Sequence, residues 1–298
     1  MNVSTARRTL LAVILVSAAV GCSPQGEPGR GPSGLDVRPL SGATAFSHAD
    51  AVRLYNREER AVAACMTSKG QSYTVQPRTA SARGEETNPY GLLTAAKAAQ
   101  DGYGIVGEYL YLRSAPRPAS ESREPAWQRA LTGTSKHRVS IALPDGTRLE
   151  YSTDGCVAQA RTDTYGPDWN TVAPVATGLA NQVIGAVEKD TGYRAAVRRW
   201  ASCMTKAGHR VTDLQAPRAA IDSRLSAAAK DPDALRALGR DEIRTASADA
   251  ACQAETGLDE AVRDVQRAVE RRMLTAADRK TVASYLADKR RALAAEDA

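Results

Sequence analysis

The sequence has few aromatic residues and no closely spaced cysteines. Aromatic residues make up 5% of the 298 residues, and phenylalanine occurs once. A core built largely from Ala, Val and Leu favours helices over a β-sandwich or a β-barrel. The two nearest of the five cysteines, Cys22 and Cys65, are 43 positions apart. Structural zinc sites and thiol oxidoreductases use C-x-x-C pairs, so we predict no metal site and no thiol redox activity.

Lysine and long runs of like charge are also scarce. Only 8 of the 40 basic residues are lysine, and no run of five like charges occurs, although the formal net charge is +6. Nucleic-acid-binding proteins usually gather basic residues on one face or in a tail. We therefore expect no nucleic acid among the partners.

Motifs of known catalytic chemistry are missing as well. The chain has no G-x-S-x-G, H-E-x-x-H or P-loop pattern. The stretch Gly102-Tyr103-Gly104 lacks the third glycine of a dinucleotide-binding fingerprint. We predict no catalytic residue and no cofactor.

The N-terminus has the pattern of an exported lipoprotein. Two arginines precede an apolar stretch of 11 residues, which suits a signal peptide and is too short to cross a bilayer. Residues 19–22 (AVGC) resemble the lipobox of bacterial lipoproteins, although most of those carry leucine at the position of Ala19. Residues 1–21 are expected to be a lipoprotein signal peptide, and Cys22 the lipidated first residue. An ordinary signal peptide is the alternative.

Residues 22–45 are rich in Gly, Pro and Ser and show no periodicity, which predicts a flexible tether. Lipid on Cys22, such as palmitate, would anchor the protein to the outer face of the cytoplasmic membrane. The expected location is therefore extracytoplasmic. The expected partners are the membrane, through this lipid, and an envelope protein or a cell-wall component.

The other four cysteines are expected to form disulfides. With Cys22 lipidated, Cys65, Cys156, Cys203 and Cys252 remain, and an exported compartment permits three connectivities among them. A Cys-Met-Thr-x-x-Gly stretch occurs twice, 138 positions apart, and a Cys-x-Ala follows each copy. A duplicated unit most simply keeps its own disulfide, so we prefer Cys65–Cys156 and Cys203–Cys252. Coincidence in an Ala-rich chain is the alternative to duplication.

Three patterns along the chain predict its elements. Ser47 suits an N-cap before a helix over residues 48–68. Residues 139–151 alternate around a Pro-Asp-Gly turn and predict a β-hairpin. From Leu258 onward the apolar residues approximate heptads that become irregular near Arg279, which indicates one long helix or two.

The predicted fold is mainly α with a small β-hairpin (α+β). It comprises two disulfide-stapled helical units and a long C-terminal helix. Residues 46–169 would form the first Cys-Met unit, which contains the hairpin. Residues 170–298 would form the second, helical Cys-Met unit.

Several motifs together resemble a group of secreted or lipid-anchored proteins of Streptomyces-type actinobacteria with duplicated Cys-Met helices. They are the lipobox, the CM-x-x-x-G helix ends, Asn-Pro-Tyr-Gly at 88–91, Gly-Tyr-Gly at 102–104 and Asp-Gly-Cys at 154–156. The resemblance covers most of residues 48–270. It implies an envelope location and disulfides, and it implies no activity, so no catalytic residue is carried over.

The favoured interpretation is a non-enzymatic envelope lipoprotein that acts as a binding or scaffolding module. A small-ligand-binding lipoprotein and an uncharacterised extracytoplasmic hydrolase are the alternatives. Trp200 lies on the apolar face of a predicted helix and is expected in the core. Possible contact residues lie in or beside predicted loops: Asn88, Tyr90, Tyr103, Trp127 and Trp169. A pocket lined by Trp127 or Trp169 would favour a small ligand, and a buried acid–base pair in a cleft would favour a hydrolase.

Overall fold

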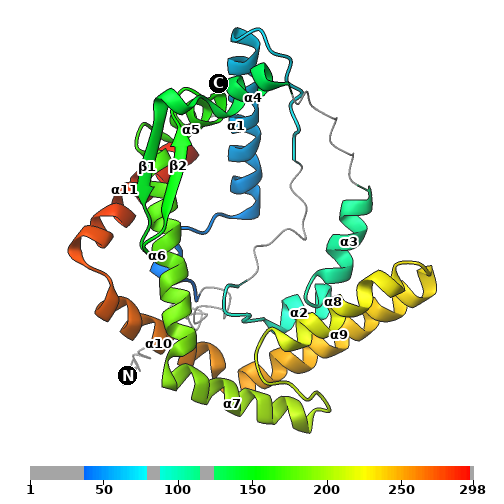
Figure 1. Cartoon of the computed structure of the whole chain (residues 1–298). Coiled ribbons are helices and arrows are strands. Elements are labelled where there is room, and N and C mark those ends of the chain that lie inside the picture. Colours follow the sequence, from blue (N-terminus) through cyan, green and yellow to red (C-terminus); the bar gives the residue numbers. More distant parts are fainter. Residues whose placement is uncertain (1–36, 79–87, 115–123, 296–298) are drawn as a thin grey trace, which may run out of the picture. The chain divides into compact units, whose positions relative to one another are not determined.

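The protein is mainly helical, with one β-hairpin (Figure 1). The computed structural model describes residues 37–78, 88–114 and 124–295. Within these ranges lie eleven α-helices and a two-stranded antiparallel sheet. Disulfides join Cys65 to Cys156 and Cys203 to Cys252. The predicted fold class is confirmed, and Cys22 with the expected signal peptide lies outside the described residues.

The second half of the chain is almost continuously helical, and the first half contains the hairpin. The first half contains α1 (His48–Ser68), α2 (Ala95–Asp101), α3 (Ile105–Ser114), α4 (Pro125–Thr132), β1 (Arg138–Ala142), β2 (Arg148–Ser152) and α5 (Cys156–Tyr165). The second half contains α6 (Trp169–Lys189), α7 (Thr191–Lys206), α8 (Ala216–Ala228), α9 (Pro232–Glu255), α10 (Leu258–Met273) and α11 (Ala276–Ala294).

Side-chain caps set several helix starts. Ser47 Oγ accepts a hydrogen bond from the backbone N–H of Asp50, so α1 begins where the sequence predicts. Thr275 and Asp278 form a reciprocal capping box at the start of α11. The C-terminal segment is therefore two helices, because α10 ends at Met273 and this cap starts a new helix at Ala276.

Both Cys-Met helices end in the same local geometry. Met66 O accepts from Gln71 N at 2.9 Å, and Met204 O accepts from His209 N at 2.8 Å. Gly70 has a φ of +70° and Gly208 a φ of +91°, which is the left-handed conformation that stops a helix in a Schellman motif. Both methionine side chains are fully buried.

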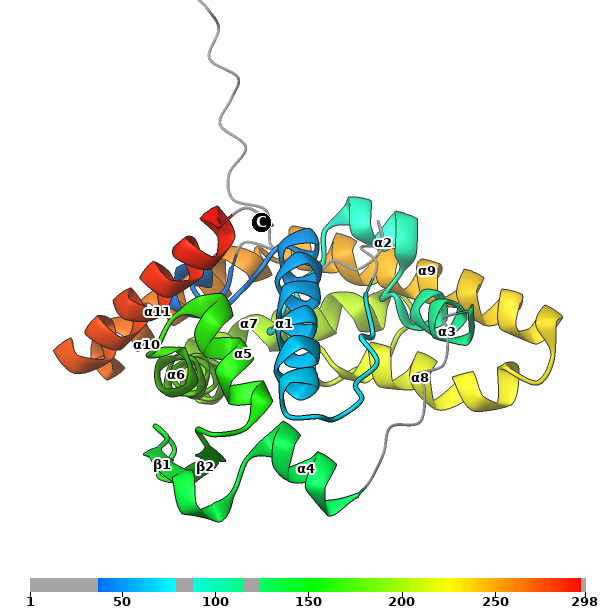
Figure 2. The ribbon, with the colours of Figure 1, turned by 90° about the horizontal axis from the view of Figure 1, so that it is seen from above.

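The two predicted units, which would meet between residues 169 and 170, are packed against each other. Helices α2 and α3 pack on α8 and α9, and α11 packs on α5, α6 and α1 (Figure 2). Glu242 on α9 accepts hydrogen bonds from the backbone N–H groups of Tyr103, Ile105 and Val106 at 2.7–3.1 Å. This carboxylate caps the first turn of α3, and it draws residues 103–106 onto the second half of the chain.

The tether predicted over residues 22–45 is wrong for residues 37–45, the part of it that the structure describes. Val37, Leu40 and Ala43 are buried in the main core, which also contains Met204 and, as predicted, Trp200. The N–H of Leu40 donates to Oε1 of Glu270 at 2.7 Å. Backbone groups of Arg38 and Leu40 thus bond α10, the segment also packs on α6, and this stretch is packed structure.

No helix in the described part of the chain combines the length and apolar composition that crossing a membrane requires.

Candidate functional site

The β-hairpin borders a large pocket. Strands β1 and β2 pair antiparallel, with Arg138 opposite Ser152 and Ala142 opposite Arg148. The turn between them closes through a hydrogen bond from Leu143 N to Thr147 O at 2.8 Å. Gly146 adopts a φ of +85° there, a conformation that the Pro-Asp-Gly sequence permits.

Two contacts hold the hairpin against the helices. At its tip, Gln182 on α6 donates to the carbonyl of Pro144, and a Cβ at Gly178 would lie 2.7 Å from Pro144 Cδ. At its base, the carboxylate of Asp154 accepts from the backbone N–H and the hydroxyl of Thr134 at 2.9 and 2.7 Å. The hairpin is thereby fixed at both ends.

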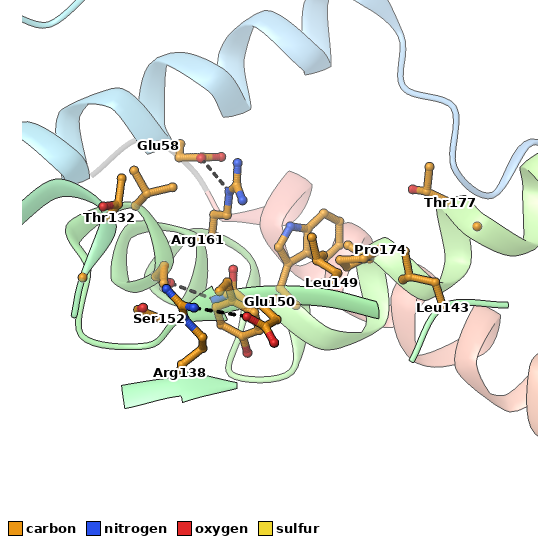
Figure 3. Close-up of a pocket in the computed structure, with 18 of the residues that line it drawn as sticks. Glu58, Thr132, Arg138, Leu143, Leu149, Glu150, Ser152, Arg161, Pro174 and Thr177 are labelled. Carbon is orange, nitrogen blue, oxygen red and sulfur yellow. Dashed lines mark hydrogen bonds and ion pairs between the residues drawn. The ribbon is translucent and has the colours of Figure 1, made fainter. Parts of the chain in front are cut away.

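A groove of about 1050 Å³ lies between the hairpin and the helices α5 and α6 (Figure 3). Its volume is at the upper end of the range for ligand pockets. One face of α6 forms its far wall, since Asn170, Pro174, Thr177 and Asn181 recur every three or four residues. Figure 3 shows Leu149 of β2 beside Pro174 of this wall. The groove therefore combines apolar contacts with side-chain amides and hydroxyls.

Charged groups in the groove are mostly paired. Arg161 bonds Glu58 at 3.0 Å, and Arg138 bonds Glu150 at 3.2 Å. Asp145 is the third carboxylate, and hydrogen bonds from Thr147 lower its pKa. The lining thus holds three carboxylates and two guanidinium groups, a net charge of −1.

The hydrogen-bond pattern of the hairpin decides which backbone groups are free. Leu143 N donates to Thr147 O, and Thr153 N donates to His137 O. Bonded and non-bonded pairs alternate along an antiparallel ladder. In this register Tyr151 is therefore in a bonded pair, and its neighbours on β2 are in non-bonded pairs.

The free edge of β2 borders the groove. Four consecutive residues, 149–152, line it, whereas β1 contributes Arg138 alone. The N–H and C=O groups of Glu150 and Ser152 point away from β1, because these residues belong to non-bonded pairs. Outside the β1–β2 ladder, neither residue has a backbone hydrogen-bond partner within the described ranges. Glu150 is exposed and Ser152 is buried, and an unpaired strand edge can accept another extended chain.

Trp169 is the predicted contact residue that reaches the groove. Its ring is stacked between Tyr165 and Tyr285, with centroid distances of 4.1 and 4.7 Å. Both faces of the indole are therefore covered, and its edge lines the groove. Burial raises the pKa of Tyr165 to about 12, so this ring stack is neutral at physiological pH.

The other four predicted contact residues are buried, which corrects their assignment to an exposed surface. Asn88, Tyr90, Tyr103 and Trp127 are each at most 7% exposed. Asn88 donates to Val37 O, and Trp127 donates to Ser72 O. The polar side-chain atoms of Asn88, Tyr103 and Trp127 bind groups that come from distant parts of the chain, a relation that loop composition does not reveal.

Buried carboxylates occur away from the groove. Asp249 is fully buried and accepts hydrogen bonds from Trp200, Gln253 and Tyr103 at 2.8–3.1 Å. Burial raises the pKa of Asp249. It lines neither of the two best-formed pockets of the described residues, so its observed contacts are structural. Among those residues, no cluster of His, Cys, Asp and Glu is arranged to hold a metal ion.

The sequence predicted the hairpin and missed the groove. The signals available were Pro174 within a helical pattern and the turn at Pro144, and neither shows that these segments meet. Comparison with known protein families, curated proteins and solved structures finds no match to this chain. The interpretation of the groove therefore depends on its own residues.

Proposed function

We propose that the protein is an exported lipoprotein, anchored through Cys22, that binds an extended peptide segment of a partner protein along β2. The N-terminal lipobox pattern supports the anchor. The two disulfides support an oxidising, extracytoplasmic compartment. The binding module is non-enzymatic and includes the hairpin groove.

The single observation that carries the peptide proposal is the free edge of β2. The outward N–H and C=O groups of Glu150 and Ser152 repeat at roughly 7 Å, the spacing of alternate residues in an extended chain. A peptide strand beside β2 would satisfy these groups and add a third strand to the sheet. The wall of α6 would contact its side chains.

The charge of the groove restricts the peptide. The two arginines are already paired with glutamates, and Asp145 adds a further negative charge. A neutral or basic segment therefore fits better than an acidic one.

The anchor is tested by labelling cells with a clickable fatty acid. The wild-type protein should be labelled, and the Cys22→Ala variant should not. Cys22-independent labelling would contradict lipidation at this residue. Membrane fractionation of both forms then measures how much the lipid contributes to location.

The groove is tested by selecting peptides from a phage-displayed random library against the purified protein. Glu150→Pro removes one outward N–H of β2 and leaves the ladder bonds intact, because that N–H does not bond β1. Ser140→Pro is the matched control, since Ser140 lies directly opposite on β1 and does not line the groove. Glu150→Pro should reduce the affinity of selected peptides at least tenfold, and Ser140→Pro should leave it unchanged.

A second pair of variants tests the helical wall. Thr177 and Thr171 are both exposed on α6, and only Thr177 lines the groove. Thr177→Trp should block binding, and Thr171→Trp should not. N-methylation at alternate peptide residues should also abolish binding. Peptides that bind all four variants alike would overturn the strand-addition proposal.

A small ligand in the same groove is the second candidate, and the position of Trp169 favours it. A small ligand would not depend on the backbone edge. It would be displaced by Thr177→Trp and would tolerate Glu150→Pro.

A further inference from the structure

A cluster of basic side chains lies where α10 ends and α11 begins (Figure 1). Five exposed residues in the last two turns of α10 and the first two turns of α11 form it: Arg267, Arg271, Arg272, Arg279 and Lys280. We call these five residues the basic corner. None of them forms an ion pair with another described residue.

The acidic residues of this region already have partners within the fold. Residues 265–295 contain eight basic residues and only three acidic ones. Each acidic residue has a hydrogen-bond partner outside the basic corner: Leu40 for Glu270, Thr275 for Asp278 and Arg291 for Asp288. Within the described ranges, no carboxylate therefore neutralises the basic corner through a direct ion pair.

Helix electrostatics explain only part of this cluster. The helix dipole stabilises a cation in the last turn, which accounts for Arg271 and Arg272. Arg279 and Lys280 follow the start of α11, the end of a helix at which the dipole favours anions. Arg267 also lies four residues before Arg271, and like charges at this spacing repel each other. An anionic partner would relieve this repulsion.

The N-terminal part of the described chain lies on α10 beside the basic corner. Gln266 donates to the carbonyl of Arg38 at 2.8 Å, and one turn later Glu270 accepts from the N–H of Leu40. Gln266 and Glu270 immediately precede Arg267 and Arg271, so residues 38–40 lie along the flank of α10 next to these arginines. Residues 22–36 link Cys22 to this point, and a fully extended chain of that length spans at most about 50 Å.

We propose that the basic corner binds the anionic lipid headgroups of the membrane to which Cys22 is anchored. The proposal rests on the lipid anchor proposed above, which keeps the entry point on α10 within about 50 Å of the bilayer. Exposed Lys and Arg side chains are attracted to an anionic bilayer surface at short range. An acidic protein would also match the charge, but the bilayer is the surface that the anchor holds close.

Co-sedimentation of an unlipidated chain with vesicles tests the surface separately from the anchor. Residues 22–298 with Cys22→Ala contain the whole described fold. This chain should sediment with vesicles made of phosphatidylglycerol and phosphatidylcholine in equal parts. It should not sediment with vesicles of phosphatidylcholine alone, and high salt should release it, because salt screens exposed charges.

A fourfold variant removes most of the basic corner: Arg267→Gln, Arg271→Gln, Arg272→Gln and Lys280→Gln. Arg279 is kept, because it donates to the carbonyl of Leu274. Affinity for the phosphatidylglycerol vesicles should fall at least tenfold, and thermal unfolding of the variant checks that the fold is intact.

A matched control removes three arginines and one lysine from other exposed positions that form no ion pair with a described residue: Arg129→Gln, Arg210→Gln, Lys230→Gln and Arg240→Gln. Its net charge falls by the same amount, and it should bind vesicles as the parent chain does. Equal loss of binding in the two fourfold variants would overturn the assignment to the basic corner.

Two further outcomes would overturn the proposal. They are the absence of binding to phosphatidylglycerol vesicles and tighter binding to a purified anionic cell-wall polymer than to these vesicles. Failure of the anchor is a separate result, because the fatty-acid labelling in cells depends on Cys22, and the vesicle assay uses a chain without lipid.

Discussion

The indole N–H of Trp200 donates to Oδ1 of Asp249 at 2.8 Å, and both side chains are fully buried. The same carboxylate accepts from Gln253, whose amide oxygen binds the N–H of Leu93 at 2.9 Å. Asp249 also accepts from Tyr103. One carboxylate thus joins α7, α9 and the segment that leads into α2 and α3.

Removing this carboxylate should destabilise the whole fold. Asp249→Ala leaves three buried donors without their acceptor, and we expect the free energy of unfolding to fall by about 3 kcal/mol or more. Urea denaturation followed by circular dichroism measures the change. Asp264→Ala replaces an exposed aspartate on α10 and should alter stability by less than about 0.5 kcal/mol. Equal effects of the two substitutions would contradict the role of the network.

Stability should also depend on pH through Asp249. Burial raises its pKa, and the three hydrogen bonds only partly oppose that shift. Between the ordinary carboxyl pKa of about 4 and the raised value, the folded protein binds more protons than the unfolded chain. This contribution to stability is therefore lost as pH rises through that window.

The side chain of Asp249→Asn cannot ionise, so this variant lacks the pH-dependent contribution to stability. The difference in unfolding free energy between wild type and Asp249→Asn should be largest at acidic pH and should shrink as pH rises. Denaturant unfolding at a series of pH values measures it. Asp264→Asn should show no such trend. If the difference between wild type and Asp249→Asn instead grew as pH rises, the predicted direction of the pH dependence would be wrong.

The disulfides should contribute similar amounts to stability. The sequence separations are 91 for Cys65–Cys156 and 49 for Cys203–Cys252. The loop-entropy model gives about 4 kcal/mol for each, with the longer loop larger by about 0.5 kcal/mol. Double Cys→Ser variants of each pair, unfolded in urea, measure these values. Reduction of the wild type should reproduce the sum, and a pair whose removal costs nothing would contradict the prediction.

Two glycines provide a matched test of the hairpin support. A Cβ at Gly155 would overlap the backbone of Thr132 and Gly133, at the base of the hairpin. Gly155→Ala should therefore destabilise by about 2 kcal/mol or more and weaken peptide binding in the groove. Gly185, on α6, has no atom within 4 Å of its Cβ position. Gly185→Ala should stabilise by up to about 1 kcal/mol, and the two thermal midpoints should shift in opposite directions.

Local signals predicted much of the secondary structure. The N-cap Ser47 and the helix end at Gly70 bound α1, and alternation around Pro144 gave the hairpin. Other elements were missed or displaced. Helix α3 was not predicted, because its first turn is capped by Glu242 from more than a hundred residues away.

Sequence patterns predicted the solvent exposure of side chains least well. Tyr90 and Tyr103 lie in Gly-rich stretches that resemble surface loops, yet both are buried. Tyr103 donates to Asp249 on α9, and Tyr90 belongs to the same core cluster as Val262 and Val269 of α10. These helices come much later in the chain. The predicted tether failed in the same way at Leu40, whose N–H binds Glu270.

The sequence by itself determined the helical class, the hairpin and the preferred disulfide pairing, because capping residues, turn residues and a repeated Cys-Met stretch act over short distances or by internal comparison. Only the tertiary structure decided where the pockets lie. The hairpin groove exists because Pro144 contacts Gly178 and Gln182, which lie more than thirty residues later in the chain. Such tertiary contacts depend on the packing of many side chains at once, and no local sequence pattern predicts them.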